Sequence, residues 1–105
     1  MEQDLTVFFK GLADQTRQRI INILLYYPAV NVNDLSEILS VPQSKISRHL
    51  AILRHSGWLV YTRRDKWVYY KINPGLDSRF LEALKSIFNQ FLLFESDHKT
   101  AQKLL

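Results

Sequence analysis

Short polar side chains and two cations fill five of the six positions that follow Pro42. They are Gln43, Ser44, Lys45, Ser47 and Arg48. Amides and hydroxyls can hydrogen-bond to base edges in the major groove of DNA, and long cations beside them can contact bases or phosphates. These residue types therefore predict recognition of double-stranded DNA, provided that one structural element presents them together.

A helix is the predicted element. Ile46, Leu50 and Leu53 recur at spacings of four and three residues, which places them on one helical face and leaves the polar set on the other. Pro42 suits the start of a helix, and Gly57 suits its end because glycine adopts left-handed backbone angles without a steric penalty. A solvated amphipathic helix has the same pattern, so the next segment of the chain has to distinguish the two.

That segment predicts a β-hairpin at residues 59–72. Residues 59–63 and 67–72 are rich in aromatic and β-branched side chains, and Arg64-Asp65-Lys66 forms the turn. A charged hairpin tip often serves solubility alone, but directly behind a recognition helix it indicates a wing that contacts phosphates or a minor groove. The predicted DNA contacts are Gln43, Ser44, Lys45, Ser47, Arg48, His49, Arg54, Arg63, Arg64 and Lys66.

The charge distribution supports a polyanionic partner. The chain carries a formal net charge of +4, yet residues 43–71 contain seven cations and only one anion, so the remainder is slightly acidic. A basic segment on an acidic body is typical of a module that docks on nucleic acid. Arg17 and Arg19 lie outside this segment and are expected to be solvated at the surface.

The segment before the polar set predicts a helical scaffold. Residues 3–13 and 14–27 carry apolar side chains at helical spacing, with Asp14 as the cap of the second helix. A third helix is expected over residues 34–41, close before the recognition helix. Two short helices joined by a short connection, the second polar at its outer start, predict a helix-turn-helix over residues 33–57.

A last helix is predicted over residues 77–98, starting at Asp77 or Ser78, with a frayed tail after it. Its apolar stripe is larger than one small winged domain can cover, which favours a homodimer through this helix and the first one. The alternative is that the helix folds back onto its own core. The predicted dimer residues are Leu5, Phe8, Phe9, Phe80, Leu84, Ile87, Phe88, Phe91 and Phe94.

Length and composition limit the remaining possibilities. The 105 residues predict one domain, residues 1–105, mainly α with a β-hairpin wing and about five helices: a winged helix-turn-helix. The absence of cysteine excludes disulfides and thiolate metal sites. The sequence contains no membrane-length apolar run, no signal peptide and no constellation of catalytic residues. We therefore expect a cytoplasmic, non-enzymatic protein without a cofactor.

With these elements in this order, nearly the whole chain resembles the ArsR-type (ArsR/SmtB) winged-helix repressors. GLADQTRQRIINIL is similar to the opening helix pair of that family. SVPQSKISRHLAILRHSGWLV and RRDKWVYYKI are similar to its recognition helix and wing. The resemblance implies a homodimeric repressor that binds an inverted-repeat operator and leaves it when a ligand binds.

The sequence departs from this family at the metal sites. Members that sense arsenic, cadmium or lead carry Cys-x-Cys where this chain has Asn31 and Asn33, and asparagine supplies no thiolate. Members that sense zinc or nickel use acidic residues and histidines along the last helix, where this chain offers only Asp97 and His98 beside Glu95. A repressor that senses a hard metal there, and a winged-helix module that binds an acidic protein, remain alternatives, and the effector is unknown.

Overall fold

The computed structural model describes residues 4–105, which form six helices, a β-hairpin and a third, short strand. This is the predicted winged helix-turn-helix, with one helix more than expected. In chain order the elements are α1 (Leu5–Leu12), α2 (Gln15–Leu24), β1 (Val30–Asn31), α3 (Val32–Leu39), α4 (Gln43–His55), β2 (Leu59–Arg64), β3 (Trp67–Ile72), α5 (Ser78–Phe88) and α6 (Leu92–Leu104).

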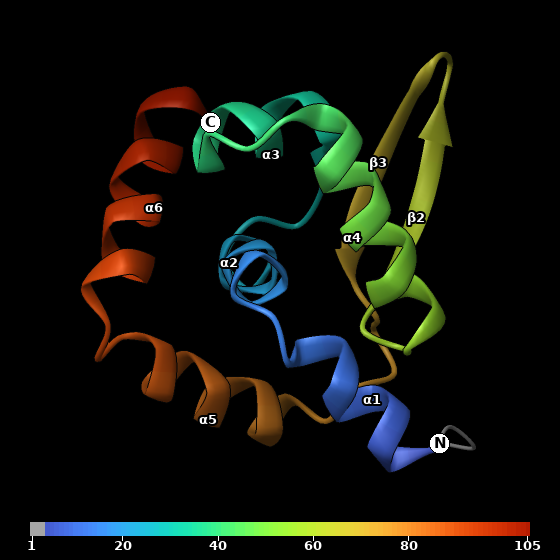
Figure 1. Cartoon of the computed structure of the whole chain (residues 1–105), viewed down its shortest axis with the longest axis vertical. Helices are drawn as coiled ribbons and strands as arrows, with labels where there is room; N and C mark the ends of the chain where they lie inside the picture. The colour runs from blue at the N-terminus through green and yellow to red at the C-terminus, as the bar shows by residue number, and fades with distance from the viewer. Residues whose placement is uncertain (1–3) are drawn as a thin grey trace.

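Helix α2 is the centre of the fold. Figure 1 shows it nearly end-on, with the other helices arranged around it. Its last five residues, 20–24, are all buried, and the Asp14 carboxylate caps its start by accepting a hydrogen bond from the Arg17 N–H. A helix that is apolar on several faces requires neighbours on several sides. The core therefore forms around α2, and the other helices pack against it.

The three strands form an antiparallel sheet in the order β1-β3-β2. The hairpin pairs Leu59 with Ile72 at its base and Arg64 with Trp67 at its tip, as the sequence predicts. Strand β1 was not predicted, because two residues are too few to show a periodicity. It joins β3 through Val30 opposite Tyr70, and this pairing connects the base of the wing to the start of α3.

The end of α4 is fixed by its predicted glycine. Gly57 has a φ of 94°, and its N–H donates to the Arg54 carbonyl at 3.2 Å. The Trp58 N–H donates to the Leu53 carbonyl at 2.9 Å. These two bonds make up a Schellman motif, which satisfies carbonyls that the last helical turn leaves free. The chain thereby turns sharply from the recognition helix into the wing.

Trp58 also ties the first helix to this corner. Its fully buried indole stacks on Phe8 with a ring-centroid distance of 4.1 Å, and its Nε1 donates to the Phe8 carbonyl at 2.7 Å. Gly11 is buried one helical turn further on, where a Cβ atom would lie 2.9 Å from the Cβ of Ser56. The absence of a side chain at Gly11 therefore permits the close approach of α1 to the end of α4.

The predicted single helix over residues 77–98 is wrong, because the chain turns back between α5 and α6. Phe91 has extended backbone angles, φ −114° and ψ 128°, and α6 then continues to Leu104, so the tail is helical rather than frayed. The reversal brings Phe94 against Phe88 with ring centroids 4.6 Å apart. It also lays α6 beside α2 and α3 (Figure 1).

The packing of α1 on Trp58 and of α6 on α5 corrects part of the predicted dimer surface. Four of its residues are core side chains of their own chain, each no more than 6% exposed: Phe8, Leu84, Phe88 and Phe94. Phe80 is partly buried against them. Leu5, Phe9, Ile87 and Phe91 are between 48% and 65% exposed. The alternative expectation, a helix that folds back onto its own core, therefore holds for the buried half of the apolar stripe.

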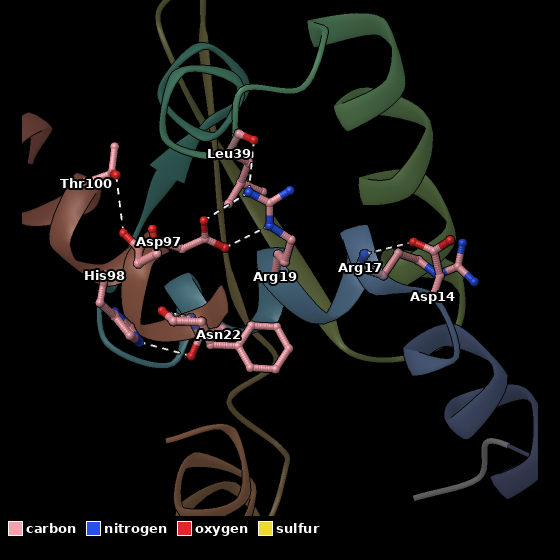
Figure 2. A network of polar contacts seen from close by, with 10 residues as sticks. Asp14, Arg17, Arg19, Asn22, Leu39, Asp97, His98 and Thr100 are labelled. Atoms are coloured by element: carbon pink, nitrogen blue, oxygen red, sulfur yellow. Dashed lines mark hydrogen bonds and ion pairs between the residues drawn. The ribbon is translucent and has the colours of Figure 1, made fainter. Parts of the chain in front are cut away.

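A buried ion pair attaches α6 to α2. The Asp97 carboxylate accepts hydrogen bonds from Arg19 Nε at 2.8 Å and Arg19 Nη2 at 2.9 Å, as Figure 2 shows. The same guanidinium donates to the Leu39 carbonyl at the end of α3. The sequence suggested that Arg19 is solvated at the surface. In the structure its planar side chain instead links three helices.

Asn22 extends this attachment by one turn (Figure 2). Its Nδ2 donates to the Phe94 carbonyl, so its Oδ1 is the acceptor for His98 Nε2 at 3.0 Å. Burial lowers the pKa of His98, although the charge of Asp97 opposes the shift. His98 is accordingly a neutral imidazole at pH 7 with its proton on Nε2.

Candidate nucleic-acid interface

Helix α4 presents the polar set that the sequence predicts. Ile46, Leu50 and Leu53 have no exposed surface, so one face of the helix lies entirely in the core. The opposite side is open to solvent over the first two turns. Its exposed residues are Gln43, Ser44, Lys45, Ser47 and Arg48. The helix-turn-helix therefore offers a row of hydrogen-bonding groups and cations that the rest of residues 4–105 leaves exposed.

The start of α4 is held against α3. Gln43 Nε2 donates to Asn33 Oδ1 at 2.9 Å, and Asn31 caps α3 by accepting from the Asp34 N–H at 2.8 Å. The helix-turn-helix connection contains Ser40, whose φ of 55° is in the left-handed region. These local bonds set the separation of the two helices, so the first turn of α4 has a defined position.

The wing extends beside α4 beyond the body of the helices (Figure 1). In the β-ladder Tyr61 and Arg63 lie on the same face, and the Arg54 guanidinium carbon of α4 is 5.1 Å from the Tyr61 ring centroid. Arg64 lies on the opposite face, over the Tyr69 ring at 6.0 Å. The two neighbouring wing arginines therefore face different sides, with Arg63 on the side of the recognition helix.

The tip of the wing is a tight turn. Asp65 has a φ of 54°, a left-handed conformation that Asp tolerates better than most residues, and Lys66 beside it is exposed. The turn thus forms without a glycine.

The cations of this surface are available to an external anion. All seven are exposed: Lys45, Arg48, Arg54, Arg63, Arg64, Lys66 and Lys71. None of the ion pairs found within residues 4–105 includes any of them. An unpaired cation that can bind a phosphate releases the counterions condensed on DNA, which is the main source of sequence-independent affinity. The surface is therefore suited to grip a phosphate backbone around the polar row of α4.

His49 does not belong to this surface, contrary to its place among the predicted contacts. Only 7% of the residue is exposed, because it lies on the inward side of α4 between the core positions Ile46 and Leu53. Its Nδ1 is 3.2 Å from Arg17 Nη1 and 3.9 Å from Asp14 Oδ2. Burial is the main cause that lowers the pKa of His49, so the ring is neutral at pH 7.

Arg17 is the residue near this site that sequence reasoning missed. It was expected on the solvated surface, but it bonds to backbone carbonyls of α1 and to His49. No local pattern could reveal this, since the two side chains are 32 positions apart.

The asparagines that replace the family's Cys-x-Cys, and the Asp97 offered as a hard-metal ligand, have other partners in the fold. Asn31 and Asn33 serve as a helix cap and as the acceptor for Gln43. Both oxygens of Asp97 accept hydrogen bonds from Arg19. Across the described part of the chain, no group of three or more His, Asp or Glu side chains is close enough to hold a metal ion. A metal at Asp97 would have to displace the guanidinium first.

Comparison with known proteins identifies the family. Residues 14–61, which include the helix-turn-helix and the first half of β2, match the family model described as "Bacterial regulatory protein, arsR family". The transcriptional repressor PagR of Bacillus anthracis is 35% identical over 71 residues, which cover 68% of this chain and 71% of PagR. The chain belongs to the ArsR family.

ArsR-family relatives with higher identity are named for arsenic. The arsenical resistance operon repressor of Escherichia coli is 47% identical over 68 residues, covering 65% of this chain and 58% of that protein. The regulator ArsR2 of Pseudomonas putida is 43% identical over 77 residues, which cover 73% of this chain and 67% of ArsR2. The matched region thus spans about three fifths to two thirds of the length of these relatives.

Solved ArsR-family structures have the same fold. HlyU from Vibrio cholerae superposes with a TM-score of 0.70 at 26% identity, over 82% of this chain and 89% of HlyU. The PagR structure gives a TM-score of 0.65 at 31% identity, over 76% of this chain and 87% of PagR. The named relatives are transcriptional regulators: PagR and the Escherichia coli protein are called repressors, while HlyU is called an activator. No helix within residues 4–105 is long and apolar enough to cross a membrane.

Proposed function

We propose that this protein is a homodimeric repressor of transcription that reads an inverted-repeat DNA operator with α4. The observation that carries the proposal is the exposed polar row on α4, whose cations and those of the wing beside it form no ion pair within residues 4–105. In this arrangement Gln43, Ser44, Lys45, Ser47 and Arg48 enter the major groove, while Arg54, Arg63, Arg64 and Lys66 hold phosphates. A protein that acts on the bacterial chromosome works in the cytoplasm.

The second copy would dock on α1 and α5. These helices lie along the same edge of the molecule (Figure 1). There the rings of Phe9 and Phe80 meet edge-on, with their centroids 6.4 Å apart. A groove of about 320 Å³ runs between the two helices beside Leu5. Ile87 and Phe91 continue the exposed apolar surface at the end of α5. The solved winged domain of Mb0332 from Mycobacterium bovis, described as homodimeric, provides a precedent for the fold.

The effector differs from that of the arsenic-named relatives. This chain has no cysteine, so it cannot bind arsenic through thiolates. The two positions that resemble the family's Cys-x-Cys are asparagines whose side chains hold α3 and α4 in place. We infer a repressor that responds to another signal or to none.

The test is in-vitro selection of bound DNA from a random pool, with the purified protein at near-physiological salt. The expected result is an imperfect palindrome whose half-sites lie one DNA turn, about 34 Å, apart. A pool that stays random would contradict sequence-specific reading and favour a module that binds an acidic protein.

Selection with Arg48→Ala tests the role of α4 directly. If Arg48 reads a base, the variant should lose about 1–3 kcal/mol on the selected site and accept other bases at one position. Arg79→Ala removes an exposed arginine of α5 that pairs with Asp77, and it should leave the selected sequence unchanged. An equal loss on every sequence would reassign Arg48 to a phosphate contact.

A further inference from the structure

One side chain connects three helices behind the proposed DNA-binding surface. Arg17, in the first turn of α2, donates from Nε to the Gly11 carbonyl at 2.6 Å and from Nη2 to the Lys10 carbonyl at 3.3 Å. Its Nη1 is 3.2 Å from His49 Nδ1 on α4. The same guanidinium therefore holds the end of α1 and the inward side of the recognition helix.

The protons of this cluster follow from its geometry. A guanidinium has only donors, so His49 Nδ1 accepts the bond from Arg17 and the ring carries its proton on Nε2. Nε2 is buried and has no hydrogen-bond partner within residues 4–105. A buried donor without a partner destabilises the folded state. His49 thus keeps a costly orientation in which its one satisfied nitrogen faces Arg17.

Burial lowers the pKa of His49, and the cations around the ring lower it further. Lys45 and Arg48 on α4 and Arg17 on α2 disfavour an imidazolium, while Asp14 at the start of α2 favours it. A proton on Nδ1 would abolish the acceptor for Arg17. The hydrogen bond from Arg17 on α2 to His49 on α4 therefore exists only while the His49 ring is neutral.

We propose that Arg17 is a positioning residue that, through His49, fixes the orientation of α4 for DNA binding. The inference rests on the proposed function, since it assigns Arg17 a role in the same surface. Base reading requires side chains to be held within about 0.5 Å of their working positions. The rigid guanidinium fork, which bonds to three acceptors through three different nitrogens, supplies such a constraint next to Arg48. It also connects α4 with α1, where the second copy is proposed to dock.

The experiment measures DNA affinity by fluorescence anisotropy on the selected duplex, using the full chain. Arg17→Met keeps the aliphatic stem without donors, and His49→Leu removes the acceptor. His49→Asn is the rescue variant, since its amide oxygen can replace Nδ1 as the acceptor. Gln18→Met is the matched control, because Gln18 also donates to a carbonyl of α1, that of Leu12, but has no hydrogen bond to α4.

Arg17→Met and His49→Leu should each weaken binding by about tenfold, the loss expected for a hydrogen bond with a charged partner. His49→Asn and Gln18→Met should stay within about threefold of the wild-type affinity. Binding that is unchanged in the first two variants would overturn the inference, and so would an equal loss in Gln18→Met. If Arg17→Met does not fold, the two His49 variants decide, because they leave the bonds to α1 intact.

Amide hydrogen exchange of the free protein gives a second readout that needs no DNA. Exchange over the first half of α4 should increase in Arg17→Met and His49→Leu and remain at the wild-type level in Gln18→Met and His49→Asn. If the wild type binds no DNA but exchange follows this pattern, the proposed function fails while the positioning role of Arg17 stands. Uniform exchange in all variants would reject the positioning role itself.

Discussion

At the scale of single residues, small local features determine how closely the helices approach one another. Gly11 allows α1 to meet the end of α4, and Gly57 turns the chain out of α4. His49 is buried and His98 is half-buried, and burial lowers the pKa of both rings, which keeps them neutral at pH 7. A substitution at Gly11 and a change in the protonation of the two histidines should therefore alter the stability of the fold.

Gly11→Ala should destabilise the protein, because an extra methyl group in a packed site usually costs about 1–3 kcal/mol. Its Cβ would lie 3.2 Å from Trp58 Cδ1 and closer still to Ser56. Alanine's better helix propensity, about 1 kcal/mol, offsets only part of this cost. Urea unfolding measures the change. Gly75→Ala is the control, because its Cβ would meet only Asn73 Oδ1 at 3.3 Å, and an equal loss there would remove the steric explanation.

Acidification should destabilise the fold through the histidines. Burial lowers the folded-state pKa of His98 below its ordinary value of 6.5, so the unfolded chain takes up the proton first as the pH falls. The stabilisation is therefore complete above about pH 6.5 and is lost progressively below it. Thermal unfolding at pH 7.5 and 5.5 measures the effect.

His98→Gln should reduce this pH dependence, because the Gln amide can still donate to Asn22 but does not titrate. The pH dependence that remains comes from His49, because burial lowers its pKa in the same direction. Identical slopes for the variant and the wild type between pH 7.5 and 5.5 would exclude His98 as a source.

At the scale of elements, the wing and α6 are fixed by different forces. The wing is a β-ladder whose two arginines face opposite sides, whereas α6 is attached by a buried ion pair and an amide network. One element is arranged to meet an outside partner, and the other completes the core.

Arg64→Ala should weaken binding to all DNA sequences alike and reduce the slope of log affinity against log salt by about one unit. The reason is that a phosphate contact carries charge but no sequence information. Binding titrations over a range of salt concentrations measure the slope. Lys103→Ala removes an exposed cation from α6 instead and should leave the slope unchanged. A wild-type slope in Arg64→Ala would remove the outer face of the wing from the interface.

Asp97→Ala should cost about 3 kcal/mol of unfolding free energy, because it leaves Arg19 without its partner in a largely buried site. The two side chains are only 6% and 18% exposed. Glu95→Ala on the same helix breaks an exposed pair with Lys99 and should cost less than about 1 kcal/mol. Denaturant unfolding compares them, and equal losses would show that the ion pair does not attach α6.

At the scale of the whole molecule, the distribution of surfaces suggests how two copies assemble. The helix-turn-helix and wing carry the cations, whereas α1, α5 and the turn after α5 carry the exposed apolar residues Leu5, Phe9, Ile87 and Phe91. A dimer through the apolar edge leaves both cationic surfaces free, which an inverted repeat requires.

Phe9→Glu and Phe91→Glu should each raise the dimer dissociation constant about ten- to hundredfold, as expected when an aromatic side chain worth roughly 1.5–3 kcal/mol of burial is lost. Sedimentation velocity over a range of concentrations measures the change. Ile52→Glu places a charge on an exposed apolar residue of α4 and should leave the dimer intact. Dimers that persist in both Phe variants would place the interface elsewhere.

The sequence alone determined the features that depend on neighbouring residues. The caps at Asp14 and Asp77, the turn at Asp65 and the end of α4 at Gly57 were all predictable, because each is a bond or a backbone preference within a few positions. Helical spacing likewise predicted that Ile46, Leu50 and Leu53 face the core. It also predicted an exposed polar row made of Gln43, Ser44, Lys45, Ser47 and Arg48.

Only the tertiary structure decided the features that depend on distant partners. The stripe from Phe80 to Phe94 is equally consistent with one exposed helix or with two that fold back, and the contacts of α6 with Arg19 and Asn22, more than 70 positions away, select the second. His49 shares its helix with the exposed row, but packing turned it inward towards Arg17. Side-chain periodicity defines a face, whereas the elements that meet there determine whether that face lies in the core, in solvent or at a partner.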